Sequence, residues 1–134
     1  MKIDRIEVRF VEAELDQPFG WSQRWTNTRS LVVLKVFTDH GIVGWGETYG
    51  SLESVAAIAS VARLAIGENP ENISQIWHKI HRATFQSHMY TGAAVMAASA
   101  IDTALHDILG KSTGKPVAEV MGGRLHDSIA GYAT

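Results

Sequence analysis

The chain has 134 residues, the length of one ordinary domain, and its 46% hydrophobic and 19% charged residues are typical of globular proteins. A formal net charge of −2, without any run of Lys or Arg, speaks against nucleic acid or a membrane as a partner. The lack of cysteine excludes disulfides, thiolate nucleophiles and Cys-based zinc sites. The N-terminus, "MKIDRIEVRF", alternates charged and apolar residues unlike a signal peptide or a membrane span, so we expect a cytoplasmic protein.

The first strand is predicted in residues 5–10, where Ile6, Val8 and Phe10 alternate with charged residues. Residues 15–28 (LDQPFGWSQRWTNT) follow it, and they are rich in aromatic side chains. This stretch predicts a long loop between strands. Long loops inside compact domains are more often functional than idle.

Two more strands are predicted in residues 31–49, joined by a tight turn at residues 39–41 (Asp-His-Gly). The first of them is apolar on both faces apart from Lys35, so we expect it to be the central strand.

Helical periodicity begins at Ser51. Helices are predicted over residues 51–67, 71–85 and 91–114, with a short fourth helix in residues 116–123. Ser51 is the expected N-cap of the first helix, and Gly67 and Gly114 are expected helix ends. The predicted inward faces consist of Leu52, Val55, Ala56, Ala59, Ala62 and Ile66, widened by Ile58 and Val61; Ile73, Ile76, Trp77, Ile80 and Thr84; and Ala93, Met96, Ala97, Ala100, Ile101, Ala104, Leu105 and Ile108.

This order predicts an α+β fold, in which a three-stranded antiparallel meander is followed by a bundle of three to four helices on one face of the sheet. Residues 128–134 (SIAGYAT) read as one further strand without a partner.

The stretch Gly44-x-Gly46-x-x-x-Gly50 invites a phosphate-loop interpretation. Its spacing is one residue off the dinucleotide fingerprint, and the strand before it is the second arm of a hairpin rather than the start of a βαβ unit. The favoured interpretation is structural, because Gly44 and Gly46 share one strand face and would let a helix lie close. Glu47 lies on the opposite face beside large apolar residues, so it is expected either to be paired or to face a site.

Histidine and acid pairs on the predicted helices give no active site by themselves. His78 and His81 are three residues apart, which suits a metal, but no third ligand has suitable spacing and we interpret both as surface residues. Asp102/His106 and Asp107/Lys111 are spaced i, i+4 and are interpreted as pairs on one helix face, each worth a few tenths of a kcal/mol.

The stretch from Ala97 to Lys111, with Pro116-Val117 and Met121-Gly122-Gly123, resembles the N-terminal signature of the mandelate racemase/muconate lactonizing enzyme family, within the enolase superfamily. Residues 38–47 (TDHGIVGWGE) resemble the family's turn and third strand. The sequence departs from the pattern at His106, where tryptophan is common, and at Val120, where leucine is usual. Matching residues at the family's spacing are Asp102, Ala104, Asp107, Gly110, Lys111 and Pro116.

The resemblance implies a capping domain over residues 1–125, with residues 126–134 as the linker and first strand of a (β/α) barrel. The family's catalytic bases and its three acidic Mg²⁺ ligands would then lie beyond Thr134, and none is assigned to this chain. The implied reaction removes the proton α to a carboxylate while Mg²⁺ stabilises the enediolate. The 134-residue chain alone is expected to be inactive.

The family's capping domain supplies two loops that close over the barrel mouth, and these correspond to residues 17–27 and 47–53. The expected substrate-binding residues are Phe19, Trp21, Arg24, Trp25 and Tyr49. Packing of these side chains on their own domain or on a neighbouring subunit is the alternative.

The form that the signature takes in residues 104–123, together with the polar first loop, is more similar to the acid-sugar dehydratases of the family than to its cycloisomerases. The resemblance therefore implies a dehydratase that acts on a small carboxylate substrate. A racemase, epimerase or cycloisomerase of the same superfamily is the close alternative. Family analogy implies a homo-oligomer. A rival from another class is a free-standing binding module, which would keep the capping fold without a barrel and expose its docking faces.

Overall fold

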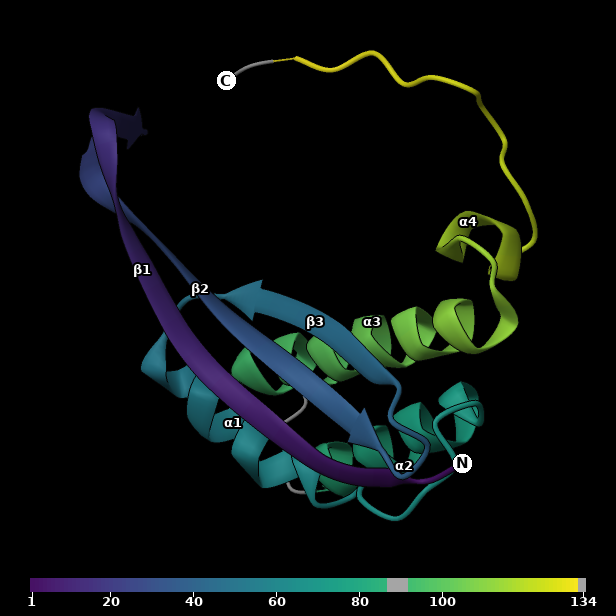
Figure 1. Cartoon of the computed structure of the whole chain (residues 1–134). Coiled ribbons are helices and arrows are strands. Elements are labelled where there is room, and N and C mark those ends of the chain that lie inside the picture. Colours follow the sequence, from purple (N-terminus) through teal and green to yellow (C-terminus); the bar gives the residue numbers. More distant parts are fainter. Residues whose placement is uncertain (87–91, 133–134) are drawn as a thin grey trace.

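A computed structural model describes residues 1–86 and 92–132 of the chain. Three antiparallel strands form one sheet in the order β1-β2-β3, and the helices pack on one side of it (Figure 1). The predicted α+β fold, with its central second strand, is confirmed. The elements are β1 (Ile3–Trp21), β2 (Arg24–Thr38), β3 (Val43–Tyr49), α1 (Leu52–Ala62), α2 (Ile73–Gln86), α3 (Ala93–Thr113) and α4 (Val117–Val120).

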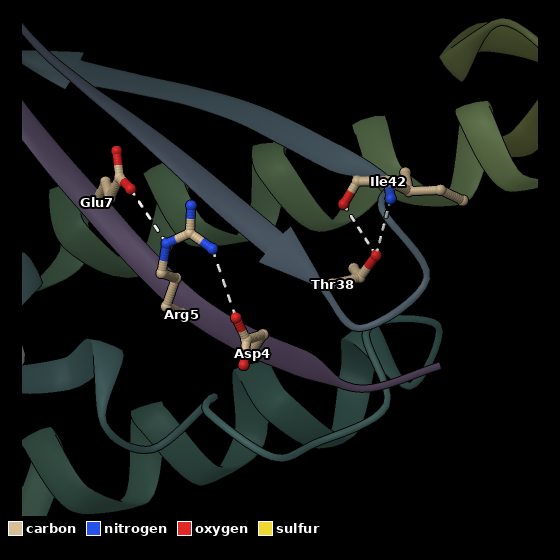
Figure 2. Close-up of polar contacts among 5 residues, drawn as sticks. All are labelled: Asp4, Arg5, Glu7, Thr38 and Ile42. Carbon is tan, nitrogen blue, oxygen red and sulfur yellow. Dashed lines mark hydrogen bonds and ion pairs between the residues drawn. The ribbon is translucent and has the colours of Figure 1, made fainter.

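Local signals in the sequence placed most of the element ends. The β2–β3 turn is held by Thr38, whose hydroxyl accepts from the Ile42 N–H at 3.0 Å and donates to the Ile42 carbonyl at 2.9 Å (Figure 2). The Ser51 hydroxyl caps α1 by accepting from the Ser54 N–H at 3.1 Å. Gly114 ends α3 in the left-handed conformation, with φ of 68°.

The core lies between the sheet and α3. Val32, Leu34 and Val36 on β2 are fully buried and point toward the helices. α3 contributes the buried residues Ala97, Ala100, Ile101, Ala104, Leu105 and Ile108, as its predicted face requires. Met96 and Trp77, which were also expected to be inward, are instead exposed.

Gly44 and Gly46 let α3 lie directly on β3. A Cβ atom at Gly46 would overlap the Ala100 carbonyl oxygen, and one at Gly44 would overlap the Ala104 carbonyl oxygen. The structural interpretation of these glycines is therefore confirmed. The backbone of each glycine is packed against the backbone of α3, which leaves no room for a phosphate between them.

The predicted inward face of α1 is confirmed at Ile58, Val61 and Ala62, which are buried, but it is wrong at four other positions. Leu52 is 74% exposed, and Ala56, Ala59 and Ile66 are exposed as well. The buried side is formed by Ser54, Ile58, Val61, Ala62 and Ala65. Alanine and other apolar residues occur all around this helix, so periodicity alone could not select the face that meets α3.

Residues 124–132, which follow α4, lie outside every helix and strand, and their side chains are exposed. Part of the predicted strand at 128–134 lies outside the described residues, because Ala133 and Thr134 are not described. The division at residues 125 and 126 stays a prediction. Thr91, at the predicted start of the third helix, also lies outside the described residues.

Candidate functional site

The predicted loop over residues 15–28 is wrong. β1 continues to Trp21 and β2 begins at Arg24, so the two strands form a long hairpin that extends past the end of β3 (Figure 1). Only Ser22 and Gln23 lie in the turn, both with positive φ, of 28° and 71°. Two successive positive φ values match the twist of a two-residue hairpin turn, although glycine or asparagine usually occupies such positions.

Four of the five predicted binding residues lie at the end of this hairpin arm, which comprises residues 12–30. Trp21 is paired with Arg24 across the strands, and Phe19 is paired with Thr26. The Phe19 and Trp21 rings are 6.0 Å apart, and the Arg24 guanidinium lies 5.7 Å from the centre of the Trp21 ring. These three side chains therefore form one cluster.

Trp25 is turned elsewhere. It is paired with Gly20, and its ring covers that glycine so closely that a Cβ there would come within 2.7 Å of it. The Trp25 residue is nevertheless 74% exposed. The missing side chain at Gly20 thus fixes where the Trp25 indole lies.

Tyr49 lies at the end of β3 and is 66% exposed. Tyr49 and Arg24 both line a small polar depression with a volume of about 230 Å³. The structure therefore brings together two predicted residues that are 25 positions apart in the sequence, whereas Phe19, Trp21 and Trp25 do not line this depression. Its lining residues are Arg24, Thr26, Thr28, Arg29, Ser30, Tyr49 and Gly50.

The depression combines two cations with hydroxyl groups. The Arg29 guanidinium lies 4.3 Å from the centre of the Phe19 ring, a stacking geometry that holds its position. Among residues 1–86 and 92–132, neither Arg24 nor Arg29 has a carboxylate partner. The Glu12 carboxylate accepts from the hydroxyl of Ser30, one of the lining residues, at 2.7 Å.

Sequence reasoning missed Arg29 and the hydroxyl residues of this site. A signal was present for the hydroxyl residues, because Arg24, Thr26, Thr28 and Ser30 alternate along β2 and so fall on one face of a strand. Arg29 is out of phase with this alternation. The signal became visible only once the stretch was known to be a strand rather than a loop.

The Asp107–Lys111 pair does more than link two turns of a helix. The Lys111 ammonium donates to Asp107 at 2.7 Å and also to the Val43 carbonyl at 2.7 Å. Asp107 in turn accepts the Trp45 backbone N–H at 2.8 Å. The pair therefore ties α3 to the free edge of β3 and covers polar backbone groups that would otherwise be open to a foreign strand.

The other i, i+4 pair also forms. His106 Nδ1 lies 3.3 Å from the Asp102 carboxylate and 3.0 Å from the Asp102 carbonyl oxygen. Two open hollows of about 660 Å³ each adjoin this pair, one beside the start of α2 and one beside α4. Both are larger than the depression at Arg24, but neither contains a predicted binding residue.

Two remaining candidates lie elsewhere. The Glu47 carboxylate is exposed and has no ion-pair or hydrogen-bond partner within the described ranges, so the expected pairing does not occur inside this part of the chain. His81 is stacked between Trp77 and Phe85, with ring centres 5.0 Å and 5.6 Å away, and His78 is exposed on the same helix.

The described residues do not fit a magnesium site. Nowhere in residues 1–86 and 92–132 do three His, Asp or Glu side chains come together in a group that could hold a metal ion. In the same ranges, no helix is both long enough and apolar enough to cross a membrane.

Comparison with known proteins identifies the fold. Residues 5–122 match the N-terminal domain of the mandelate racemase / muconate lactonizing enzyme family. The chain is 33% identical, over 100% of its length and 35% of the relative, to D-galactarolactone cycloisomerase of Agrobacterium fabrum. Identity reaches 42%, over 74% of the chain and 26% of the relative, with D-galactonate dehydratase of Xanthomonas euvesicatoria.

The similarity extends to three-dimensional structure. A crystal structure of an enolase from Streptomyces coelicolor superposes with a TM-score of 0.85 and 32% sequence identity, covering 95% of this chain and 33% of that one. The chain thus spans about a quarter to a third of the length of these proteins.

Proposed function

Because this chain belongs to the mandelate racemase/muconate lactonizing enzyme family as its N-terminal capping domain, we propose that it caps the active site of an enzyme acting on an acid sugar. The complete enzyme removes the proton α to the substrate carboxylate, and loss of water is the favoured outcome. The capping domain binds polar groups of the substrate and keeps water away from the reacting carbon.

The observation that carries this proposal is the polar depression between the hairpin arm and the end of β3. Its guanidinium groups suit a carboxylate, since Arg presents paired N–H donors. Its Thr, Ser and Tyr hydroxyls can both donate and accept, which suits a chain of substrate hydroxyls. An acid sugar carries both kinds of group on one small molecule.

The aromatic residues of the arm support the same role. Phe19 and Trp21 lie beside the depression, each with a guanidinium over its ring, and cation–π attraction favours these positions of the two cations. Trp25 is largely exposed on the other side of the arm, where it faces away from the depression and is free to contact a part of the substrate that extends past the arm. We therefore retain Phe19, Trp21, Arg24, Trp25 and Tyr49 as substrate-binding residues and add Arg29.

Magnesium, when bound, would stabilise the enediolate charge in such an enzyme. Since the described residues do not form a metal site, no step of this proposal passes through the metal. The residues of this chain bind and orient the substrate. The acid, the base and the cation are assigned to the barrel domain of the longer protein.

The two relatives named above favour different outcomes for the same substrate class. The name D-galactonate dehydratase supports elimination of water, and the name D-galactarolactone cycloisomerase supports an isomerisation as the second candidate. Mass spectrometry separates them, because dehydration lowers the product mass by one water and isomerisation leaves it unchanged.

The test uses the complete protein with Mg²⁺ and a panel of aldonates, aldarates and their lactones. Arg24→Ala should lower kcat/KM about tenfold to a hundredfold, because it removes charged hydrogen bonds worth about 1.5–3 kcal/mol. Arg82→Ala, on the exposed side of α2, is the matched control and should leave kcat/KM unchanged. Failure to turn over any acid sugar would contradict the function, whereas turnover that Arg24→Ala does not change would contradict only the site.

A further inference from the structure

The face of the sheet turned away from the helices carries two unpaired charges in register. Arg9 is opposite Val33, and Val33 is opposite Glu47, so the three residues form one row across the sheet. Within the described ranges, neither Arg9 nor Glu47 makes an ion pair or hydrogen bond. Adjacent strands are about 4.8 Å apart, so these opposite charges lie about 10 Å apart on either side of Val33.

The neighbouring row contains a second pair of opposite charges, from Glu7 on β1 and Lys35 on β2. Lys35 leans toward β3, with its ammonium 4.4 Å from the centre of the Trp45 ring. Glu7 stays on β1, where it accepts from Arg5 at 3.1 Å (Figure 2). Both rows therefore have one sign of charge over β1 and the opposite sign over β3.

The same face is partly apolar and hollow. Val11, Leu31 and Trp45 are exposed, and a hollow of about 330 Å³ lies between β1 and Trp45. In Figure 1 the helices lie behind the sheet, and none of them crosses this face. Exposed apolar patches rimmed by polar groups are typical of protein interaction sites.

We propose that this face is an interface between two copies of this chain, related by a two-fold axis that runs along β2 above Val33. Rotation about that axis exchanges β1 and β3, so Arg9 of each copy faces Glu47 of the other. By the same exchange, Glu7 faces the Lys35 ammonium of the other copy. Two antiparallel sheets stacked in this way lie about 10 Å apart, the spacing of a β-sandwich.

Charge complementarity is the argument for a second copy as the occupant. All four charged positions in the two rows meet an opposite charge after this rotation, and Val33 meets Val33. The two Lys35 side chains lean away from the axis in opposite directions and do not collide. The interface involves neither the polar depression at Arg24 nor the edge of β3. The dimer is therefore independent of the proposed substrate binding.

Charge reversal in the complete protein tests the arrangement by sedimentation velocity. Arg9→Glu and Glu47→Arg should each weaken the dimer at least about tenfold, because like charges then face each other twice. The double variant Arg9→Glu/Glu47→Arg should restore wild-type association. A two-fold axis across the strands would instead set Arg9 against Glu7, and the double variant would then associate more weakly than either single one.

A cross-linking experiment gives an independent readout. The chain contains no cysteine, so Val33→Cys adds one thiol near the axis, and a short bis-maleimide should join two copies of the protein. Any cysteine outside this chain is first replaced by serine. Ala56→Cys, on the exposed side of α1, is the control and should stay unlinked.

Three results would overturn the proposal. The first is a wild-type protein that does not associate through this face. The second is a double variant whose association is not restored, and the third is a Val33→Cys protein that is cross-linked no more than the Ala56→Cys protein. A loss of thermal stability in Arg9→Glu, with the number of subunits unchanged, would also overturn it, because the face would then be covered within a single protein.

Discussion

Replacing Gly46 by alanine tests the contact between β3 and α3 directly. The added Cβ would overlap the Ala100 carbonyl oxygen and come within 3.0 Å of the carbonyl carbon and 3.3 Å of the Ala104 Cβ. The first two of these atoms belong to the helix backbone, which cannot move out of the way as a flexible side chain can. The helix must therefore retreat from the sheet along its buried face.

The expected loss of stability follows from this geometry. Overpacking a core costs about 1–3 kcal/mol, and a backbone obstacle puts Gly46→Ala at the upper end. Alanine also makes the unfolded chain less flexible than glycine does, which offsets about 0.4–1 kcal/mol of this cost. The free energy of unfolding should therefore fall by about 2 kcal/mol or more. For a chain of this size, that lowers Tm by about 8 °C.

Thermal unfolding followed by circular dichroism provides the assay, with two glycine-to-alanine controls. Gly131→Ala should leave Tm unchanged, because nothing lies within 4 Å of the added atom. Gly67→Ala adds no clash but places alanine at φ of 83°, so it should cost about 1–2 kcal/mol from backbone strain alone. If Gly46→Ala unfolds within about 1 °C of the wild-type protein, the close helix–strand contact is wrong.

Three further predictions concern other parts of the fold. Asp107→Ala should lower the free energy of unfolding in urea by about 1 kcal/mol, since the half-exposed Lys111 and the Trp45 N–H lose their shared acceptor, and an unchanged midpoint would refute this role. Gln23→Gly should relieve about 1 kcal/mol of strain at the hairpin turn, seen as an approximately fivefold slowing of amide exchange in the hairpin arm; faster exchange would contradict it. The Lys2 N–H, bonded at 2.7 Å, holds the pKa of Asp39 below its ordinary value of 3.8, so the carboxylate stabilises the fold above that pH and the effect is lost as pH falls through the lowered pKa. The small Tm difference between the wild-type protein and Asp39→Asn should therefore vanish in acid, and a difference that grows on acidification would disprove the assignment.

Features that depend on a few neighbouring residues were predictable from the sequence. The turn at residues 39–41, the Ser51 cap and the left-handed Gly114 each follow from the chemistry of one or two residues. The hairpin arm was not predictable, because Pro18 and Gly20 are typical of loops and the Ser22-Gln23 turn lacks the usual glycine or asparagine. A register irregularity between Glu14 and Phe19 further hides the two-residue alternation of β1.

The candidate site was also predictable only where neighbouring residues in the sequence give the signal. Aromatic and basic residues in the sequence drew attention to the stretch that forms the hairpin arm, and Arg24 and Tyr49 both line the depression. Their role in substrate binding stays a prediction. The sequence could not show that Arg29 joins them or that Asp107 and Lys111 bind the edge of β3. Those contacts link residues far apart in the chain, and only the packed structure brings them together.

The hairpin arm has a consequence for how such a protein can diverge. Between Leu31 and the hairpin turn, the sheet consists of β1 and β2 alone. The side chains of this part lie outside the buried cluster that holds the rest of the domain together. Substitutions in this arm therefore leave that cluster intact. Natural selection can explore new chemistries at the tip almost independently of the scaffold, and a library randomised there should contain few members that fail to fold.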